Sequence, residues 1–346
     1  MTEFLARPAL AAVERGWVPD PIVRRGIRSL CRQRMREIQI PQSHRAQHLD
    51  QFARSMDEAP IAPLVHKANE QHYEVPADFF QHVLGAHLKY SSAYWVGVDS
   101  LDAAEAQALA LSGAHADLRD GQQILELGCG WGSLTLWMAK TYPKAHITAV
   151  SNSKSQRLFI EKCAADAALH NLQVITADIN HFSTDQRFDR VVSVEMFEHL
   201  RNYASIFDQV AQWLKPDGRF FMHIFCHRST PYFFEDRDET DWMSRYFFSG
   251  GMMPSVDLPL CFSRSLRCLE RWNWSGVEYQ KTAEAWLKNL DREKESVKVL
   301  FEKTYGAGQA HIWINRWRVF FMACAELFGT RDGQEWQVCH YLFDRR

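Results

Sequence analysis

The stretch QQILELGCGWGSLTLWMAKTYP (residues 122–143) decides the fold class of this chain. It opens with a short apolar run typical of a buried strand, and glycines follow at positions 128, 130 and 132. The remaining residues, 133–143, have the apolar spacing of a helix. A strand, a glycine turn and a helix in this order are typical of the first unit of an α/β fold with a parallel sheet.

The alternation of strands and helices continues to about residue 225. We expect further strands at 145–151, 172–179, 188–195 and 218–225, and helices at 155–169 and 204–214. Strands that alternate with helices of about 10–15 residues predict a doubly wound, Rossmann-like parallel sheet. A last strand is expected in EWQVCHYLF, residues 335–343.

The segments on either side of this core have different patterns. Residues 1–60 alternate basic and apolar positions at helical spacing, and APIAP at 59–63 breaks the pattern. We therefore expect an N-terminal helical extension over 1–63 and one domain over 64–346, with its core at 121–225. Aromatic-rich helices are expected at 71–85 and 88–95. Together, 64–120 and 226–346 would form a lid and a C-terminal helical cap over the substrate.

Composition excludes several classes of protein. The 346 residues are 46% hydrophobic and 24% charged with a net charge of −2, which gives no basic surface for nucleic acid. No apolar run approaches the roughly 18 residues of a membrane span, and no signal peptide is recognised. The eight scattered cysteines contain no CxxC pair, which predicts reduced thiols and a cytoplasmic protein. The basic N-terminal helices leave contact with a membrane surface open, although packing on the body is favoured.

The carboxyl ends of the predicted strands carry the candidate ligand-binding residues. Glu126 lies just before the glycine turn, where a carboxylate would repel a pyrophosphate but tolerate a cationic aminoacyl sulfonium. Asn152 and Gln156 follow the next strand, and their amides can bind ribose hydroxyls in place of the usual acid. Asp178 can accept a hydrogen bond from an adenine amine, with Ile179 against the ring.

Several stretches together resemble one enzyme family: LELGCGWG (125–132), VSNSKSQ (150–156), FDRVVSVEMFEH (188–199) and LKPDGRFFMHIFCH (214–227). They are similar to the S-adenosylmethionine-dependent methyltransferases of the cyclopropane-fatty-acid-synthase family, which includes plant coclaurine N-methyltransferases. The resemblance extends to QHYEVPADFF, YSSAYW, GGMMPS and EWQVCHYLF, and so covers roughly residues 64–346. It implies a class I methyltransferase sheet.

The resemblance also implies S-adenosylmethionine as the cofactor. Tyr73, Tyr90 and Ser91 would be lid elements over its methionine moiety, although simple aromatic packing stays open for the tyrosines. The remaining expected cofactor-binding residues are Glu126, Gly128, Gly130, Gly132, Asn152, Gln156, Asp178 and Ile179.

The family contains two kinds of chemistry, and one residue favours one of them. The lipid branch methylates a double bond and uses a bound bicarbonate as the base, with residues that Glu198, His223 and Tyr279 would match here. That branch typically has glycine where this chain has Glu195, and a second carboxylate would oppose the anion. We therefore expect nitrogen methylation of a small-molecule amine, such as a flat aromatic or isoquinoline-type amine. Methylation of a phospholipid acyl chain, of sulfur or of oxygen stays open.

The reactive residues are expected in VVSVEMFEHL, residues 191–200. Glu198 or His199 would accept the proton of the amine, and Glu195 would anchor the ammonium. Stabilisation of a helix start by the two acids, and a structural role for His199, stay open. The aromatic wall of the substrate site would include Trp317, Phe328, Tyr279 and His223.

We expect no metal. The acids within 233–242 lack a calcium-loop pattern, and His223 and His227 lack further ligands at zinc spacing. A homodimer stays open, because the sequence does not determine the oligomeric state.

Overall fold

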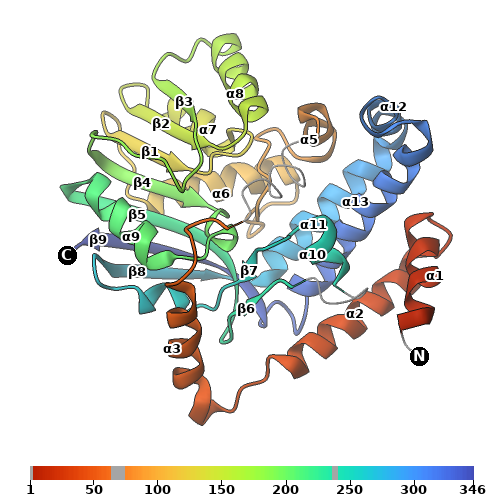
Figure 1. The fold of residues 1–346 in the computed structure, drawn as a ribbon. Coiled ribbons are helices and arrows are strands. Elements are labelled where there is room, and N and C mark those ends of the chain that lie inside the picture. The colour runs from red at the N-terminus through yellow and green to blue at the C-terminus, as the bar shows by residue number, and fades with distance from the viewer. Residues whose placement is uncertain (1–2, 64–74, 236–240) are drawn as a thin grey trace.

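A computed structural model describes residues 3–63, 75–235 and 241–346 of the chain. Seven strands form one twisted sheet in the order β3-β2-β1-β4-β5-β9-β8 (Figure 1). The strands are β1 (Gln123–Leu127), β2 (His146–Ser151), β3 (Leu172–Thr176), β4 (Phe188–Val194), β5 (Leu214–His227), β8 (Leu266–Trp274) and β9 (Trp336–Arg345). The first five strands in this order pair in parallel, and β9 is antiparallel to both β5 and β8. The mostly parallel α/β sheet predicted from the sequence is confirmed.

Helices cover both faces of this sheet because neighbouring residues of each strand point to opposite sides. Ile124 packs in a cluster with residues of α6 (Leu101–His115) and α7 (Ser133–Thr141). Leu125 packs in a second cluster with α9 (Tyr203–Trp213). A fourth helix, α8 (Lys154–Asp166), lies beside β3 at the edge of the sheet.

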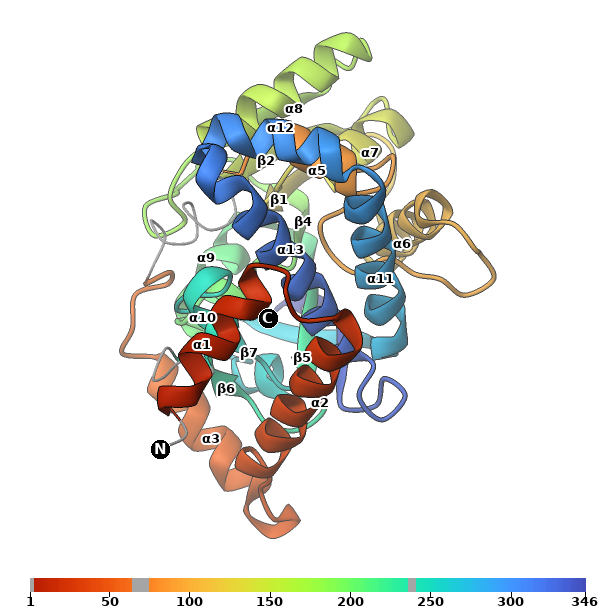
Figure 2. The same ribbon diagram turned by 90° about the vertical axis from the view of Figure 1, so that its right-hand side faces the viewer.

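The N-terminal helices pack on the C-terminal helices. α11 (Gly276–Arg292), α12 (Lys294–Tyr305) and α13 (Ala307–Phe328) pack together, and α1 (Glu3–Glu14) and α2 (Asp20–Glu37) lie across α13 (Figure 2). The Arg24 guanidinium is 2.6 Å from the Glu284 carboxylate and 3.1 Å from that of Glu326. Arg24 of α2 therefore binds the body of the protein. α3 (Arg45–Met56) and α5 (Ala77–Val83) complete the segments before α6.

The remaining short elements lie near the cap. β6 (Tyr232–Phe233) and β7 (Met252–Met253) form a separate two-stranded sheet, and α10 (Trp242–Tyr246) lies between them in the chain. Single 3₁₀ turns occur at η1 (Gln42–His44), η3 (Phe197–His199) and η4 (Leu258–Cys261).

Three local expectations need correction. Residues 88–95 are not helical, because their backbone amides bind distant side chains: Ser92 N donates to Glu195 and Ala93 N donates to Thr282. The stretch that follows β4 forms only the 3₁₀ turn η3, not the start of an α-helix. Strand β8 was not expected, since arginine, glutamate and asparagine residues interrupt its apolar residues and leave no apolar run.

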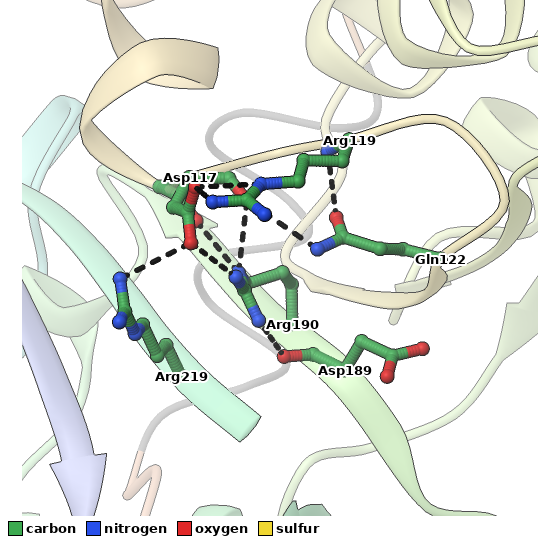
Figure 3. A network of polar contacts seen from close by, with 7 residues as sticks. Asp117, Arg119, Gln122, Asp189, Arg190 and Arg219 are labelled. Atoms are coloured by element: carbon green, nitrogen blue, oxygen red, sulfur yellow. Dashed lines mark hydrogen bonds and ion pairs between the residues drawn. The ribbon is translucent and has the colours of Figure 1, made fainter. Parts of the chain in front are cut away.

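An ionic network fixes the end of the sheet that lies away from the glycine turn (Figure 3). The Asp117 carboxylate, just after α6, binds the guanidinium groups of Arg119, Arg190 and Arg219 at 2.5–3.1 Å. Arg190 on β4 and Arg219 on β5 are paired across these two neighbouring strands. The network therefore has a structural role, since it holds α6 against the amino ends of the strands.

Candidate active site

The glycine turn after β1 brings the backbone close to a cavity. Gly128, Gly130 and Gly132 have φ values of 77°, 53° and 84°, in the left-handed region that favours glycine. A Cβ on Gly128 would lie 2.7 Å from the side chain of Met196, and one on Gly132 would lie 2.6 Å from Ile160. A Cβ on Gly130 would meet no atom within 4 Å. Gly128 and Gly132 therefore allow close packing, whereas Gly130 leaves open space.

Two cavities meet at this turn. The larger has a volume of about 830 Å³ and the smaller about 70 Å³. Four residues line both: Gly128, Gly130, Gln156 and His199. These four residues lie where the two cavities join, so a molecule bound in one cavity would contact a molecule bound in the other there.

Most expected cofactor-binding residues gather around these two cavities. Asn152 and Ile179 line the smaller one, and Tyr90, Ser91 and Glu126 line the larger. Asp178 and Gly132 line neither cavity. Asp178 instead accepts hydrogen bonds from the backbone and side-chain nitrogens of Asn180 at 2.9 and 3.0 Å. Tyr73 lies outside the described residues.

Two polar groups at the turn fit an aminoacyl sulfonium nucleoside. The Oε1 atom of Gln156 accepts a hydrogen bond from the Ser151 hydroxyl at 2.7 Å, while its Nε2 is buried without a partner in the described structure. That unpaired donor points to a ligand acceptor. Burial raises the pKa of Glu126 to about 8, and a hydrogen bond from the Thr135 hydroxyl opposes the rise. A cationic ligand nearby would favour the ionised carboxylate.

The carboxylate of Glu195 has polar contacts with three separate segments. Oε1 accepts from the backbone N–H of Ser92 at 3.0 Å and lies 3.1 Å from Nε2 of His223. Oε2 accepts from the Tyr279 hydroxyl at 2.7 Å. The side chain is 9% exposed and lines the larger cavity. Burial raises its pKa, and the nearby Lys89 ammonium opposes the rise.

The two other expected catalytic residues, His199 and Glu198, differ in their access to the cavities. His199 lines both cavities and its ring stacks on Phe248 with 5.7 Å between centroids. Burial lowers its pKa to about 4, so the imidazole is neutral near pH 7. Glu198 is fully buried, lines neither cavity and accepts a hydrogen bond from the Phe225 N–H at 2.7 Å. The structure thus brings Glu195 and His199 to the cavity, with Glu198 behind its wall.

The aromatic wall is only partly the expected one. Phe328 and Tyr279 line the larger cavity, and their rings stack with centroids 4.2 Å apart. Trp317 is fully buried among aromatic rings, including Phe79 and Phe247, and does not reach the cavity. Its position on the inner face of α13 puts it in the core, which corrects the expectation of a substrate-facing ring. His223 is also fully buried and reaches the cavity only through Glu195.

Sequence reasoning missed two features of the site. Lys89 is buried at the cavity, where it donates to the Ser91 hydroxyl at 2.5 Å and to the carbonyl of Ser92 at 2.7 Å. Burial lowers the pKa of Lys89 to about 8. A lysine inside an aromatic stretch was the available signal. The second feature is the outer wall of the larger cavity. It comes from α1, α2 and the segment between them, through Leu10, Val13, Val18, Val23, Ile27 and Leu30.

Over residues 3–63, 75–235 and 241–346, no group of three or more His, Cys, Asp or Glu side chains is arranged to hold a metal ion. Within the same residues, no helix has the length and apolar character needed to cross a bilayer.

The glycine turn, the amides after β2 and the sheet order define a class I S-adenosylmethionine-dependent methyltransferase. The family model described as "Mycolic acid cyclopropane synthetase" matches residues 64–338, and the chain belongs to this family. The protein is therefore an enzyme that uses S-adenosylmethionine as its methyl donor.

Relatives of known name include N-methyltransferases and lipid enzymes. The chain is 36% identical to (S)-coclaurine N-methyltransferase of Thalictrum flavum subsp. glaucum over 97% of this chain and 95% of the relative. It is 30% identical to the cyclopropane-fatty-acyl-phospholipid synthase of Escherichia coli K12 over 78% of this chain and 66% of the relative. A crystal structure of coclaurine N-methyltransferase bound to N-methylheliamine and SAH matches with a TM-score of 0.94 at 33% identity, covering 97% and 99% of the two chains.

Proposed function

We propose that the enzyme methylates the nitrogen of a bulky, largely apolar amine of the isoquinoline type. The single observation that carries this proposal is the Glu195 carboxylate at the cavity wall, bound by Ser92, His223 and Tyr279. A negative group in this place suits an ammonium and opposes a bound bicarbonate. The names of the N-methyltransferase relatives, which match nearly the whole chain, support the same choice.

The residues at the junction of the cavities suit an in-line displacement. When bound, S-adenosylmethionine supplies an electrophilic methyl group. Asn152, Gln156 and Ile179 would hold its nucleoside part in the smaller cavity, and Glu126 would favour its positive charge. We also propose that Gly132, Asp178 and Tyr73 contribute to cofactor binding.

Proton removal is the chemical task of the chain itself. An amine of ordinary basicity arrives protonated and cannot attack until it loses a proton. Glu195 would accept this proton and anchor the amine, because its Oε2 has one protein donor and a free lone pair. His199 would orient the neutral amine toward the smaller cavity. Glu198 would position the reactive segment through its hydrogen bond to Phe225.

Lipid methylation is the rival function. The basic α2 helix would be its membrane contact, but Arg24 and Arg28 bind Glu284 and Glu326 of the protein body. This pairing removes charge from a membrane-facing surface, so membrane contact is not favoured. The eight free cysteines support a cytoplasmic location. A homodimer and the division at residue 63 stay proposals.

A panel of acceptors with isotope-labelled S-adenosylmethionine tests the proposal. Tetrahydroisoquinoline-type amines, simple thiols, phenols and unsaturated phospholipid vesicles should be compared at equal concentration. We expect label on the nitrogen of the cyclic amines and none in the vesicles. Label in the acyl chains, with strong sedimentation of the enzyme on anionic vesicles, would instead establish the lipid function.

A further inference from the structure

Three histidines continue from Glu195 in an unbroken chain of polar contacts. Nε2 of His223 lies 3.1 Å from Oε1 of Glu195. Nδ1 of His223 lies 2.8 Å from Nε2 of His340, and Nδ1 of His340 lies 2.9 Å from Nδ1 of His115. Each separation is within hydrogen-bond range, so both nitrogens of His223 and of His340 are engaged.

The chain of histidines leads from the cavity toward the surface. His223 on β5 and His340 on β9 face each other in the antiparallel pair, and both are fully buried. His115, in the last turn of α6, is half-buried. The ring of Trp272 stacks on His115 with 3.9 Å between centroids and 3° between planes. This packing fixes the outer imidazole at the end of the chain.

We propose that His223, His340 and His115 form a proton relay that carries the proton of the acceptor amine from Glu195 to solvent. The inference rests on the proposed function, since only an acceptor that arrives protonated releases a proton before methyl transfer. A buried base that keeps its proton cannot serve a second turnover, so a path to water has a direct use.

The transfer balances with neutral imidazoles. The Glu195 carboxylate takes the proton of the ammonium on Oε2 and becomes a neutral carboxylic acid. A half-turn of the carboxyl group brings this O–H to Nε2 of His223, in the tautomer protonated on Nδ1, and transfer of the proton to Nε2 returns Glu195 to the carboxylate. Nδ1–H of His223 passes a proton to Nε2 of His340, and Nδ1–H of His340 passes one to Nδ1 of His115. Nε2–H of His115 then releases a proton to water. One proton enters and one leaves, and tautomer exchange of the rings restores the starting arrangement.

The charged surroundings keep the relay neutral. Burial lowers the pKa of His223 well below its ordinary value, and the Lys89 ammonium lowers it further. Burial, the two neighbouring imidazoles and Lys89 do the same for His340. Burial also lowers the pKa of His115. Besides Glu195 at the inner end, the structure describes no carboxylate in contact with these rings, so no imidazolium is stabilised along the path.

Two variants test the relay. His115→Ala removes the outer ring at a half-buried position, and His340→Gln keeps a polar side chain but cannot pass a proton. We expect the kcat for a tetrahydroisoquinoline-type ammonium to fall at least about tenfold in both, with KM unchanged. Added imidazole should restore kcat in His115→Ala. An acceptor that arrives neutral, such as an N-methylaniline, should keep its wild-type rate. His146→Ala, an exposed histidine at the start of β2, is the matched control.

Each outcome decides the proposal. Wild-type kcat in His115→Ala would overturn the relay while the proposed function stands. An equal loss with the neutral acceptor, or no rescue by imidazole, would also overturn it, since that result indicates a structural role. If wild-type enzyme methylates no amine, the proposed function itself fails. Should His340→Gln not fold, the His115→Ala result with its rescue suffices.

Discussion

The hydroxyl of Tyr279 donates a 2.7 Å hydrogen bond to Oε2 of Glu195. This contact joins α11, which belongs to the cap, to the end of β4 in the sheet. Together with Ser92 and His223 it makes a ready set of hydrogen-bond partners around one planar carboxylate. The Glu195 side chain is therefore the anion that these hydrogen-bond partners hold in the site.

We predict that Glu195→Gly loses amine methylation but responds to small carboxylates. The variant leaves Ser92 N–H and Tyr279 O–H without their acceptor, and formate or bicarbonate can occupy that space. Removal of the base should lower kcat about 100-fold, and formate should restore part of it. The measurement is kcat against formate concentration for one cyclic amine.

The backbone at Glu195 makes this variant a sound test of chemistry. Its φ of 48° is left-handed, so glycine relieves strain of about 1 kcal/mol. We expect a thermal midpoint close to that of wild type. Tyr279→Phe removes only one donor and leaves Glu195 in place, so this control variant should show no formate response. Equal formate activation of wild type would contradict the prediction.

Gly130→Ala should weaken cofactor binding without unfolding the protein. A Cβ there meets no protein atom within 4 Å and projects where the two cavities join. The left-handed φ adds a strain of about 1 kcal/mol. Gly121→Ala has a comparable φ of 84° and equally open space, but lies outside both cavities. Calorimetry should give a tenfold or greater loss of S-adenosylmethionine affinity, by about 1.4 kcal/mol or more, for Gly130→Ala alone.

Glu126 should make both stability and cofactor affinity depend on pH. Its folded pKa is about 8 and its ordinary value is 4.5, so the folded state holds the proton more tightly. The stabilising contribution is complete below pH 4.5 and is lost as the pH rises toward 8. The slope reaches about 1.4 kcal/mol per pH unit at most.

Urea unfolding at several pH values checks this dependence. Glu126→Gln should remove the part of the slope that Glu126 contributes, so that the variant gains stability relative to wild type at the alkaline end. Affinity for the cationic cofactor should rise with pH in wild type, because binding favours the ionised carboxylate, and should be flat in the variant. Parallel curves for the two proteins would contradict the assignment.

The sequence predicted the sheet well because its signal is local. Each parallel strand is a short apolar run, and the glycine turn needs its particular φ values whatever surrounds it. Strand β8 was not predicted from the sequence, because most of its side chains are exposed and its residues show no apolar pattern. The segment 88–95 was misread as a helix because tertiary partners such as Glu195 and Thr282 take its amides, and these lie far away in sequence.

The sequence predicted only those parts of the site that belong to recognisable motifs. Residues that follow a strand, such as Gln156 and Glu195, were placed near the ligand by the rule that binding occurs at carboxyl ends. Trp317 and Phe328 share one helix, and only the packing of α13 decides which of them faces the cavity. The contribution of α1 and α2 could not be predicted, because it depends on ion pairs such as Arg24 with Glu284.

Ile27→Trp should make the enzyme discriminate against bulky acceptors. Ile27 on α2 lines the larger cavity, far along the chain from the cofactor-binding turn. The indole would reduce the space for a large amine, so its KM should rise about tenfold, equivalent to about 1.4 kcal/mol. A single-ring amine should keep its KM, and S-adenosylmethionine affinity should not change. Ser29→Trp places the same side chain at an exposed position of the same helix and is the matched control. If Ile27→Trp leaves the KM of the bulky amine at its wild-type value, α2 does not contact the acceptor and the substrate lies closer to the sheet.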